Sequence, residues 1–179
     1  MYNSYSPQLN IAANAALLAG KSIMRFYSRL ETLKVMSKGF NDYVSEADQE
    51  AEKIITEALM KAYPQYKITA EESGSNDVKS EYEWFIDPLD GTTNFIHGIP
   101  QFAVSIGLCK DKVPILGVVY DPFKNELFCA EKGKGALMNE KKIRVAKCSS
   151  IKKAVFGTGI PYRKKDHSGV YIETLRTLM

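Results

Sequence analysis

An α+β fold, with N-terminal helices packed on an antiparallel sheet, is predicted by a change of pattern along this 179-residue sequence. Apolar residues first recur at helical spacing in two segments, one on each side of residue 40. From residue 102 they alternate with a period of two, in runs separated by turns. The 45% share of hydrophobic residues can form a core, and 25% charged residues is ordinary for a globular protein.

Two helices are expected in the first third of the chain. Ser6 can cap a helix that begins at Pro7, because a hydroxyl before a proline is a common helix start. A second helix is expected from Ser45, where the hydroxyl caps and Asp48 completes a capping box. Its apolar stripe ends before Pro64, which cannot continue a helix.

The strands are expected as a series of hairpins. Alternation predicts strands at 102–109, 113–120 and 126–130, and shorter ones at 136–138 and 143–145, each joined to the next by a turn. Such a series forms an antiparallel meander that can carry the helices on one face.

We expect two domains. Residues 1–148 form an N-terminal α+β domain, and residues 149–179 form the first strand and helix of an incomplete C-terminal α/β domain. The expected strand covers Ala154–Gly157, a turn follows at Gly159-Ile160-Pro161, and the helix runs toward Leu178.

Composition argues against several functions. The net charge is only +3 and no dense basic run is present, so nucleic-acid binding is not expected. The apolar stretch at 11–19 is shorter than the roughly 20 residues of a membrane span, and no signal peptide is visible. Cys109, Cys129 and Cys148 lack metal-binding or redox spacing, which favours reduced thiols and a cytoplasmic location.

The most informative segment begins where an apolar strand runs into Asp87-Pro88-Leu89-Asp90. Asp87 and Asp90 flank a tight turn, so both carboxylates can face one point, and the Leu89 carbonyl lies between them. Mg²⁺ prefers such hard oxygen ligands together with water and phosphate oxygens. Residues 91–94, which include Gly91, Thr92 and Thr93, then offer consecutive backbone N–H groups that suit a phosphate. The alternative is an ordinary Asp-Pro and Asp-Gly turn.

Two further polar segments precede this turn. A short strand at 67–70 leads into Glu71-Glu72, and these acids converge on Asp87 if the two strands are neighbours; otherwise they are solvated loop charges. Lys38, Asp42 and Asp48 lie at the entry to the second helix, where the alternative for Asp48 is a capping role alone.

These segments resemble the signatures of the inositol monophosphatase family over nearly the whole chain. The resemblance implies a sugar-phosphatase-like layered α/β sandwich. It implies one Mg²⁺ on Glu71, Asp87 and the Leu89 carbonyl, and a second on Asp87 and Asp90. Glu71 would also reach a weaker third ion, to which Asp48 is linked through water.

The same resemblance assigns the remaining roles. Thr92 with Glu71 would activate the attacking water, the backbone amides of Gly91 and Thr92 would bind phosphate, and Asp90 would also touch a sugar hydroxyl. Two metal ions neutralise a phosphate monoester and generate the nucleophile, so no Ser, Cys or His nucleophile is needed. His97 is expected to form a structural hydrogen bond.

The implied activity is a Mg²⁺-dependent, Li⁺-sensitive hydrolysis of inositol monophosphate or a similar small sugar phosphate. Fructose-1,6-bisphosphatase or nucleotide 3′-phosphatase activity on the same metals is an alternative, as is a non-catalytic interaction protein that keeps the fold. Analogy with the family implies a homodimer. Family chains continue into a Trp-Asp…Ala-Gly motif absent here, so a longer functional protein is expected.

Overall fold

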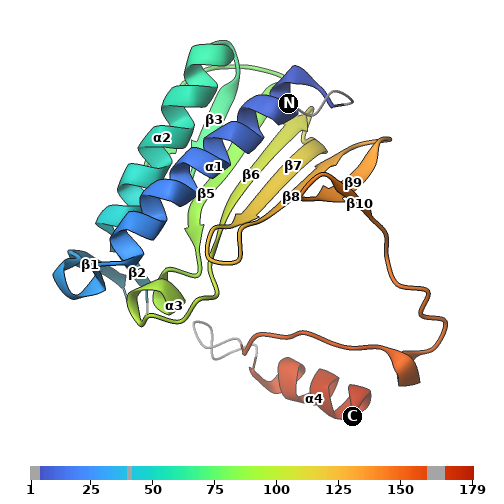
Figure 1. Cartoon of the computed structure of the whole chain (residues 1–179). Helices are drawn as coiled ribbons and strands as arrows, with labels where there is room; N and C mark the ends of the chain where they lie inside the picture. Colours follow the sequence, from blue (N-terminus) through green and yellow to red (C-terminus); the bar gives the residue numbers. More distant parts are fainter. Residues whose placement is uncertain (1–4, 40–41, 161–167) are drawn as a thin grey trace. The chain divides into compact units, whose positions relative to one another are not determined.

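The computed structural model describes residues 5–39, 42–160 and 168–179. The chain divides into two compact units, Met1–Arg144 and Val145–Met179. In the first unit, two helices lie side by side across one face of an eight-stranded sheet (Figure 1). The predicted α+β class is confirmed, with helices packed on a mixed sheet.

Both helices begin where their caps predict. Helix α1 spans Pro7–Tyr27, and the Ser6 hydroxyl accepts the backbone N–H of Leu9. Helix α2 spans Glu46–Ala62 and starts with the predicted capping box of Ser45 and Asp48. In the box, the Ser45 backbone N–H donates to Asp48 Oδ2 at 2.8 Å.

The sheet has the order β10-β9-β8-β7-β6-β5-β3-β4, and neighbours from β5 to β10 pair antiparallel. The predicted meander is therefore confirmed. Its strands are β3 Lys67–Ala70, β4 Gly74–Ser75, β5 Tyr82–Asp90, β6 Ala103–Lys110, β7 Val113–Asp121, β8 Glu126–Glu131, β9 Gly135–Met138 and β10 Lys141–Ile143.

Strand β10 starts two residues earlier than the sequence predicts. Asn139 and Glu140 both have positive φ, which gives a two-residue turn whose twist matches that of the flanking strands. Strand β3 also differs from an antiparallel arrangement, because it pairs parallel with β5, placing Ala70 opposite Ile86. This pairing meets the condition under which Glu71 and Asp87 converge.

The core lies between the helices and the sheet. Trp84 in β5 and Ile106 in β6 point toward the helices and are almost fully buried, as are Leu9 and Ile55 from α1 and α2. Alternate residues point to the other face of the sheet, where Phe85 is 43% exposed.

The cysteines are free, as expected from their spacing. Cys129 is buried, and burial raises the pKa of its thiol to about 11, so it behaves as a small apolar side chain. Cys109 is half-buried and Cys148 is exposed.

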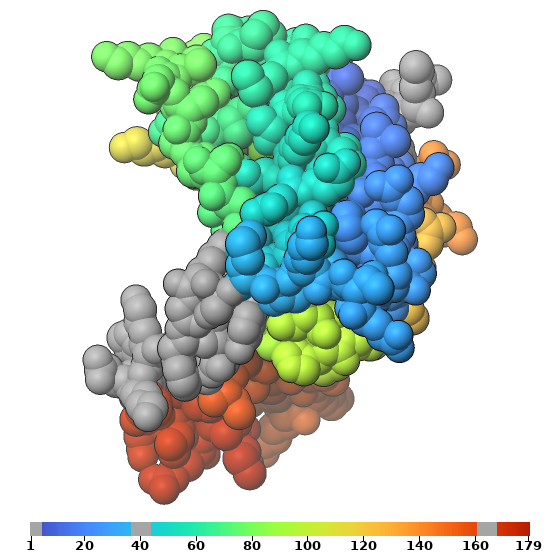
Figure 2. Space-filling model, turned by 90° about the vertical axis from the view of Figure 1, so that its left-hand side faces the viewer, coloured from blue at the N-terminus to red at the C-terminus, as the bar shows by residue number. Residues whose placement is uncertain are grey.

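Two short elements flank the end of α2 that carries Ser45. Strands β1 Val35–Gly39 and β2 Asp42–Ser45 form a separate antiparallel hairpin, and α3 spans Thr92–Ile96 beside β2. Viewed from the side of α2, the hairpin and α3 lie below the helix (Figure 2). The sequence analysis did not predict the hairpin.

The second unit contains the short helix η2 Ile151–Lys153 and helix α4 Ser168–Leu178, the helix expected near the C-terminus. The strand expected over Ala154–Gly157 is not formed, because residues 154–160 have no regular structure and a strand needs a paired neighbour. Pro161 of the expected turn lies outside the described residues. No helix in the described ranges is long and apolar enough to cross a membrane.

Candidate metal and phosphate site

A bulge in β5 brings the two aspartates of the motif to one face of the sheet. Asp87 pairs with Ser105 and Asp90 pairs with Ala103, so two residues of β5 lie opposite a single residue of β6. Pro88 has no backbone N–H to donate, which favours such an interruption. In a regular strand, residues three apart point to opposite faces; the bulge instead places both carboxylates on the face without helices.

Glu71 joins this face from the neighbouring parallel strand. Its backbone N–H donates to Ile86 O at 3.0 Å, which continues the β3–β5 pairing by one residue. The Glu71 carboxylate lies close enough to Asp87 to raise the pKa of that side chain, and both residues line a hollow of about 360 Å³ on the face without helices. The structure therefore brings these two predicted ligands together.

Burial and like charges together act on the carboxylates of this cluster. Burial, the neighbouring charge of Glu71 and, to a smaller extent, the charge of Asp90 together raise the pKa of Asp87 to about 7. Carboxylates held this close repel one another unless a proton or a cation lies between them. The donor set, made of carboxylates and a backbone carbonyl, fits a hard divalent cation.

Of the predicted carboxylate ligands, Asp90 has the weakest interaction with Asp87. Its charge raises the pKa of Asp87 less than the charge of Glu71 does. Within the described ranges, no three His, Cys, Asp or Glu side chains meet closely enough to hold a metal ion as they stand. The side chain of Asp90 is exposed.

A second cluster fixes Thr92 at the start of α3. The Thr92 hydroxyl lies 2.9 Å from Asp48 Oδ1 and 3.0 Å from the Leu89 carbonyl oxygen, and its single proton can be donated to either. Asp48 is 1% exposed and also accepts the Ser45 hydroxyl at 2.5 Å. Burial raises the pKa of Asp48, while the hydrogen bonds from Ser45 and Thr92 oppose that effect.

The turn into α3 contains the backbone that the sequence predicts to bind phosphate. Gly91 has φ of 92°, a left-handed conformation that glycine adopts without strain. The N–H groups at the start of a helix have no acceptor within the helix, so those of Thr92 and Thr93 can meet an anion. His97 Nδ1 lies 2.7 Å from the Thr93 carbonyl oxygen, the structural contact expected for that residue.

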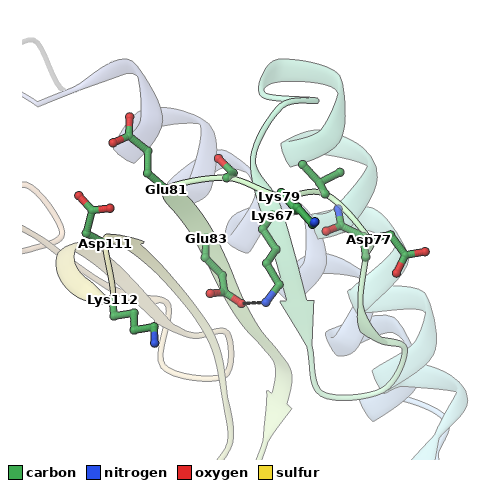
Figure 3. A pocket seen from close by; sticks show the side chains of 10 residues that line it. Lys67, Asp77, Lys79, Glu81, Glu83, Asp111 and Lys112 are labelled. Atoms are coloured by element: carbon green, nitrogen blue, oxygen red, sulfur yellow. Dashed lines mark ion pairs between the residues drawn. The ribbon is translucent and has the colours of Figure 1, made fainter.

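The other end of the sheet holds a more strongly charged hollow, which lies at the start of β5 and away from the aspartate motif (Figure 3). Four acids and three lysines line it. Lys67 and Glu83 form an ion pair at 2.8 Å, and Lys67, with smaller effects from Thr69 and Lys112, lowers the pKa of Glu83. The residues that line this hollow include none of the predicted metal ligands.

The sequence analysis did not single out Glu52 of α2. Its side chain is only 6% exposed and accepts hydrogen bonds from the two residues after Glu71. Its signal was its place four residues after Asp48, on the same side of the helix as the apolar stripe. The side chains of Lys38 and Asp42, which the sequence placed near the metals, lie outside the described residues.

The chain is similar to several known proteins. The sequence profile of the inositol monophosphatase family matches residues 4–173. An inositol-1-monophosphatase from Mesorhizobium japonicum is 43% identical over 97% of this chain and 66% of its own length. The Nus factor SuhB of Pseudomonas aeruginosa is 46% identical over 97% of this chain and 66% of its own length.

The crystal structure of the extragenic suppressor protein SuhB from Bartonella henselae superposes with a TM-score of 0.92 and 43% identity, over 97% of this chain and 67% of that one. The chain has the fold of this class of phosphatases and belongs to the inositol monophosphatase family. It spans about two thirds of the length of these relatives.

Proposed function

We propose that this chain carries the metal- and phosphate-binding part of a Mg²⁺-dependent phosphomonoester hydrolase for inositol monophosphate or a similar small sugar phosphate. The observation that supports this most is the closeness of Glu71 to Asp87, together with a Thr92 hydroxyl that buried Asp48 holds in place. Membership of the inositol monophosphatase family supports the same reading.

Glu71, Asp87 and the Leu89 carbonyl would hold one Mg²⁺, and Asp87 with Asp90 would contribute to a second. When bound, these ions would neutralise the phosphate, lower the pKa of a water and stabilise the leaving oxygen. Asp87 would need to be fully ionised in that state, which is the form that its present neighbours oppose.

The residues around the metals would position a water and move its proton. Thr92 donates its only hydroxyl proton toward Asp48 or the Leu89 carbonyl, so its oxygen lone pairs remain free to accept a hydrogen bond from a water. Glu71 would accept a second hydrogen bond from the same water. A proton that reached Thr92 Oγ1 could pass on to Asp48 Oδ1, whose raised pKa favours taking it.

Phosphate would be held by the backbone at the start of α3. The N–H groups of Gly91, Thr92 and Thr93 are placed by the left-handed Gly91, and Asp90 would contact a sugar hydroxyl. These roles need no other side chain with positive charge, because the metal ions would provide that charge.

A second candidate function is suggested by the names of relatives. Several bear the name Nus factor SuhB, including those of Pseudomonas aeruginosa and Vibrio cholerae. This chain would then serve as an interaction protein, with or without hydrolysis. Replacing Asp87 would abolish the hydrolase and leave an interaction through another surface intact.

The hydrolase proposal is tested by phosphate release from myo-inositol 1-phosphate with Mg²⁺, and with Mg²⁺ plus Li⁺, by the wild type and by Asp87→Asn. We expect Mg²⁺-dependent release that lithium inhibits and that Asp87→Asn lacks. Asp77→Asn, an acid in the distant hollow, is the matched control and should keep wild-type activity. Equal release by Asp87→Asn and wild type would refute the mechanism.

A further inference from the structure

Helix α2 presents two buried acids one turn apart, and each contacts a different loop of the site. Asp48 binds Thr92, which follows the aspartate motif. Glu52 binds the other loop: its Oε2 accepts the backbone N–H of Glu72 at 2.8 Å, and its Oε1 accepts that of Ser73 at 2.9 Å. Both oxygens of Glu52 are thus engaged by the two residues directly after Glu71.

Burying the Glu52 carboxylate costs free energy that a simple turn does not require. A carboxylate that is 6% exposed loses most of its hydration, and only strong hydrogen bonds offset that loss. Ser73 is exposed, so water could satisfy its N–H without any buried acid. Because a buried carboxylate takes the place of accessible water, we infer that its hydrogen bonds serve to hold this turn in one position.

The consequence is that Glu71 is fixed from both sides. Its own N–H is bound to Ile86 of β5, and the two N–H groups after it are bound to Glu52. The backbone that carries Glu71 therefore cannot move away from Asp87 without breaking bonds to β5 or to α2. Because Asp48 fixes Thr92 in the same way, α2 sets the distance between the two loops.

We propose that Glu52 is a positioning residue of the acidic site, which holds the turn of residues 71–73 so that the Glu71 carboxylate stays beside Asp87. Its effect on metal binding rests on the proposed function, because it presumes that Glu71 and Asp87 bind Mg²⁺. Its effect on the turn does not. The two effects can be measured separately.

The test compares Glu52→Gln with Glu57→Gln, which removes the same charge from an exposed site on the same helix. Glutamine keeps the size of Glu52 but has one acceptor oxygen instead of two, so one backbone N–H loses its partner. Mg²⁺ affinity is measured by calorimetry, and the amides of Glu72 and Ser73 are followed by ¹⁵N NMR and hydrogen exchange.

For Glu52→Gln we expect Mg²⁺ affinity to fall by about 10–100-fold, the usual effect of losing a residue that orients a metal ligand. We also expect faster exchange of the Glu72 and Ser73 amides, while Glu57→Gln changes neither quantity. A folded Glu52→Gln protein with wild-type Mg²⁺ affinity would overturn the proposal.

Two other results also decide the matter. If the wild-type chain binds no Mg²⁺, the metal assignment fails, and unchanged exchange of the two amides in Glu52→Gln would overturn the positioning role as well. If Glu52→Gln does not fold, Glu52→Asp keeps the charge and shortens the reach. Weakened Mg²⁺ binding in that variant supports the proposal, and wild-type binding overturns it.

Discussion

The raised pKa of Asp87 makes Mg²⁺ binding depend on pH in a defined way. In the metal-free protein, burial and the charge of Glu71 raise this pKa to about 7, so a proton and the metal ion compete for the same carboxylate. Mg²⁺ affinity is therefore measured on both sides of this pH. The variant Asp87→Asn removes the carboxylate for which the proton and the metal ion compete.

The expected magnitude follows from the pKa. At about pH 6, roughly 90% of the Asp87 side chains carry a proton, and at about pH 8 roughly 10% do. The apparent Mg²⁺ affinity should therefore fall about tenfold from pH 8 to pH 6, and about tenfold again by pH 5. At about pH 6, each Mg²⁺ should release roughly 0.9 protons.

Calorimetry in buffers of different ionisation enthalpy measures both the affinity and the protons released. Asp77→Asn should follow the wild-type curve, because this acid lies at the other end of the sheet. Asp87→Asn should bind Mg²⁺ weakly at every pH. If the wild-type protein binds Mg²⁺ with the same affinity at about pH 6 and about pH 8, the assignment of the proton and the metal to Asp87 is refuted.

Three further outcomes concern stability. In the folded protein the pKa of Asp87 exceeds its ordinary value of 3.8, so the contribution of Asp87 to stability falls as pH rises from about 4 to about 7. Asp87→Asn should therefore raise the Tm of the metal-free protein at about pH 8 but not at about pH 4. An equal change of Tm at both pH values would contradict this. Gly91→Ala should cost about 1–3 kcal/mol in urea unfolding, because its φ is 92° and a Cβ would lie 2.8 Å from the Gln101 carbonyl oxygen; an unchanged midpoint would contradict it. Gly20→Ala should lower the Tm, because a Cβ would lie 2.7 Å from Cδ1 of the Tyr120 ring. Overpacking of about 1–3 kcal/mol exceeds the gain in helix propensity of about 1 kcal/mol. A higher Tm would contradict this and show that the ring moves aside.

Local signals predicted most of the fold. Ser6 and Ser45 mark the starts of α1 and α2, because a capping hydroxyl acts within a few residues of its own position. Alternation predicted the strands of the meander, since each pairs with the next along the chain. The parallel pairing of β3 with β5 joins segments separated by a loop, and the sequence gives no local sign of it.

The site could be predicted in its residues but not in its geometry. Asp87 and Asp90 were identifiable from the motif, whereas the bulge that turns both to one face depends on pairing with β6. Glu52 resembles an ordinary helical acid in the sequence, and its role appears only when the turn after Glu71 is packed against α2. Residues that act through long-range backbone contacts leave little trace in the spacing of a single sequence.

The central claim is that Glu71, Asp87 and Asp90 together bind a divalent cation. Mn²⁺ prefers the same oxygen ligands as Mg²⁺ and broadens the NMR signals of nearby nuclei, so it locates the ion directly. We expect broadening of the ¹⁵N–¹H signals of Glu71, Asp87 and residues 89–92, with reversal by excess Mg²⁺. Broadening centred on the hollow around Asp77 and Asp111, or none at all, would contradict the account.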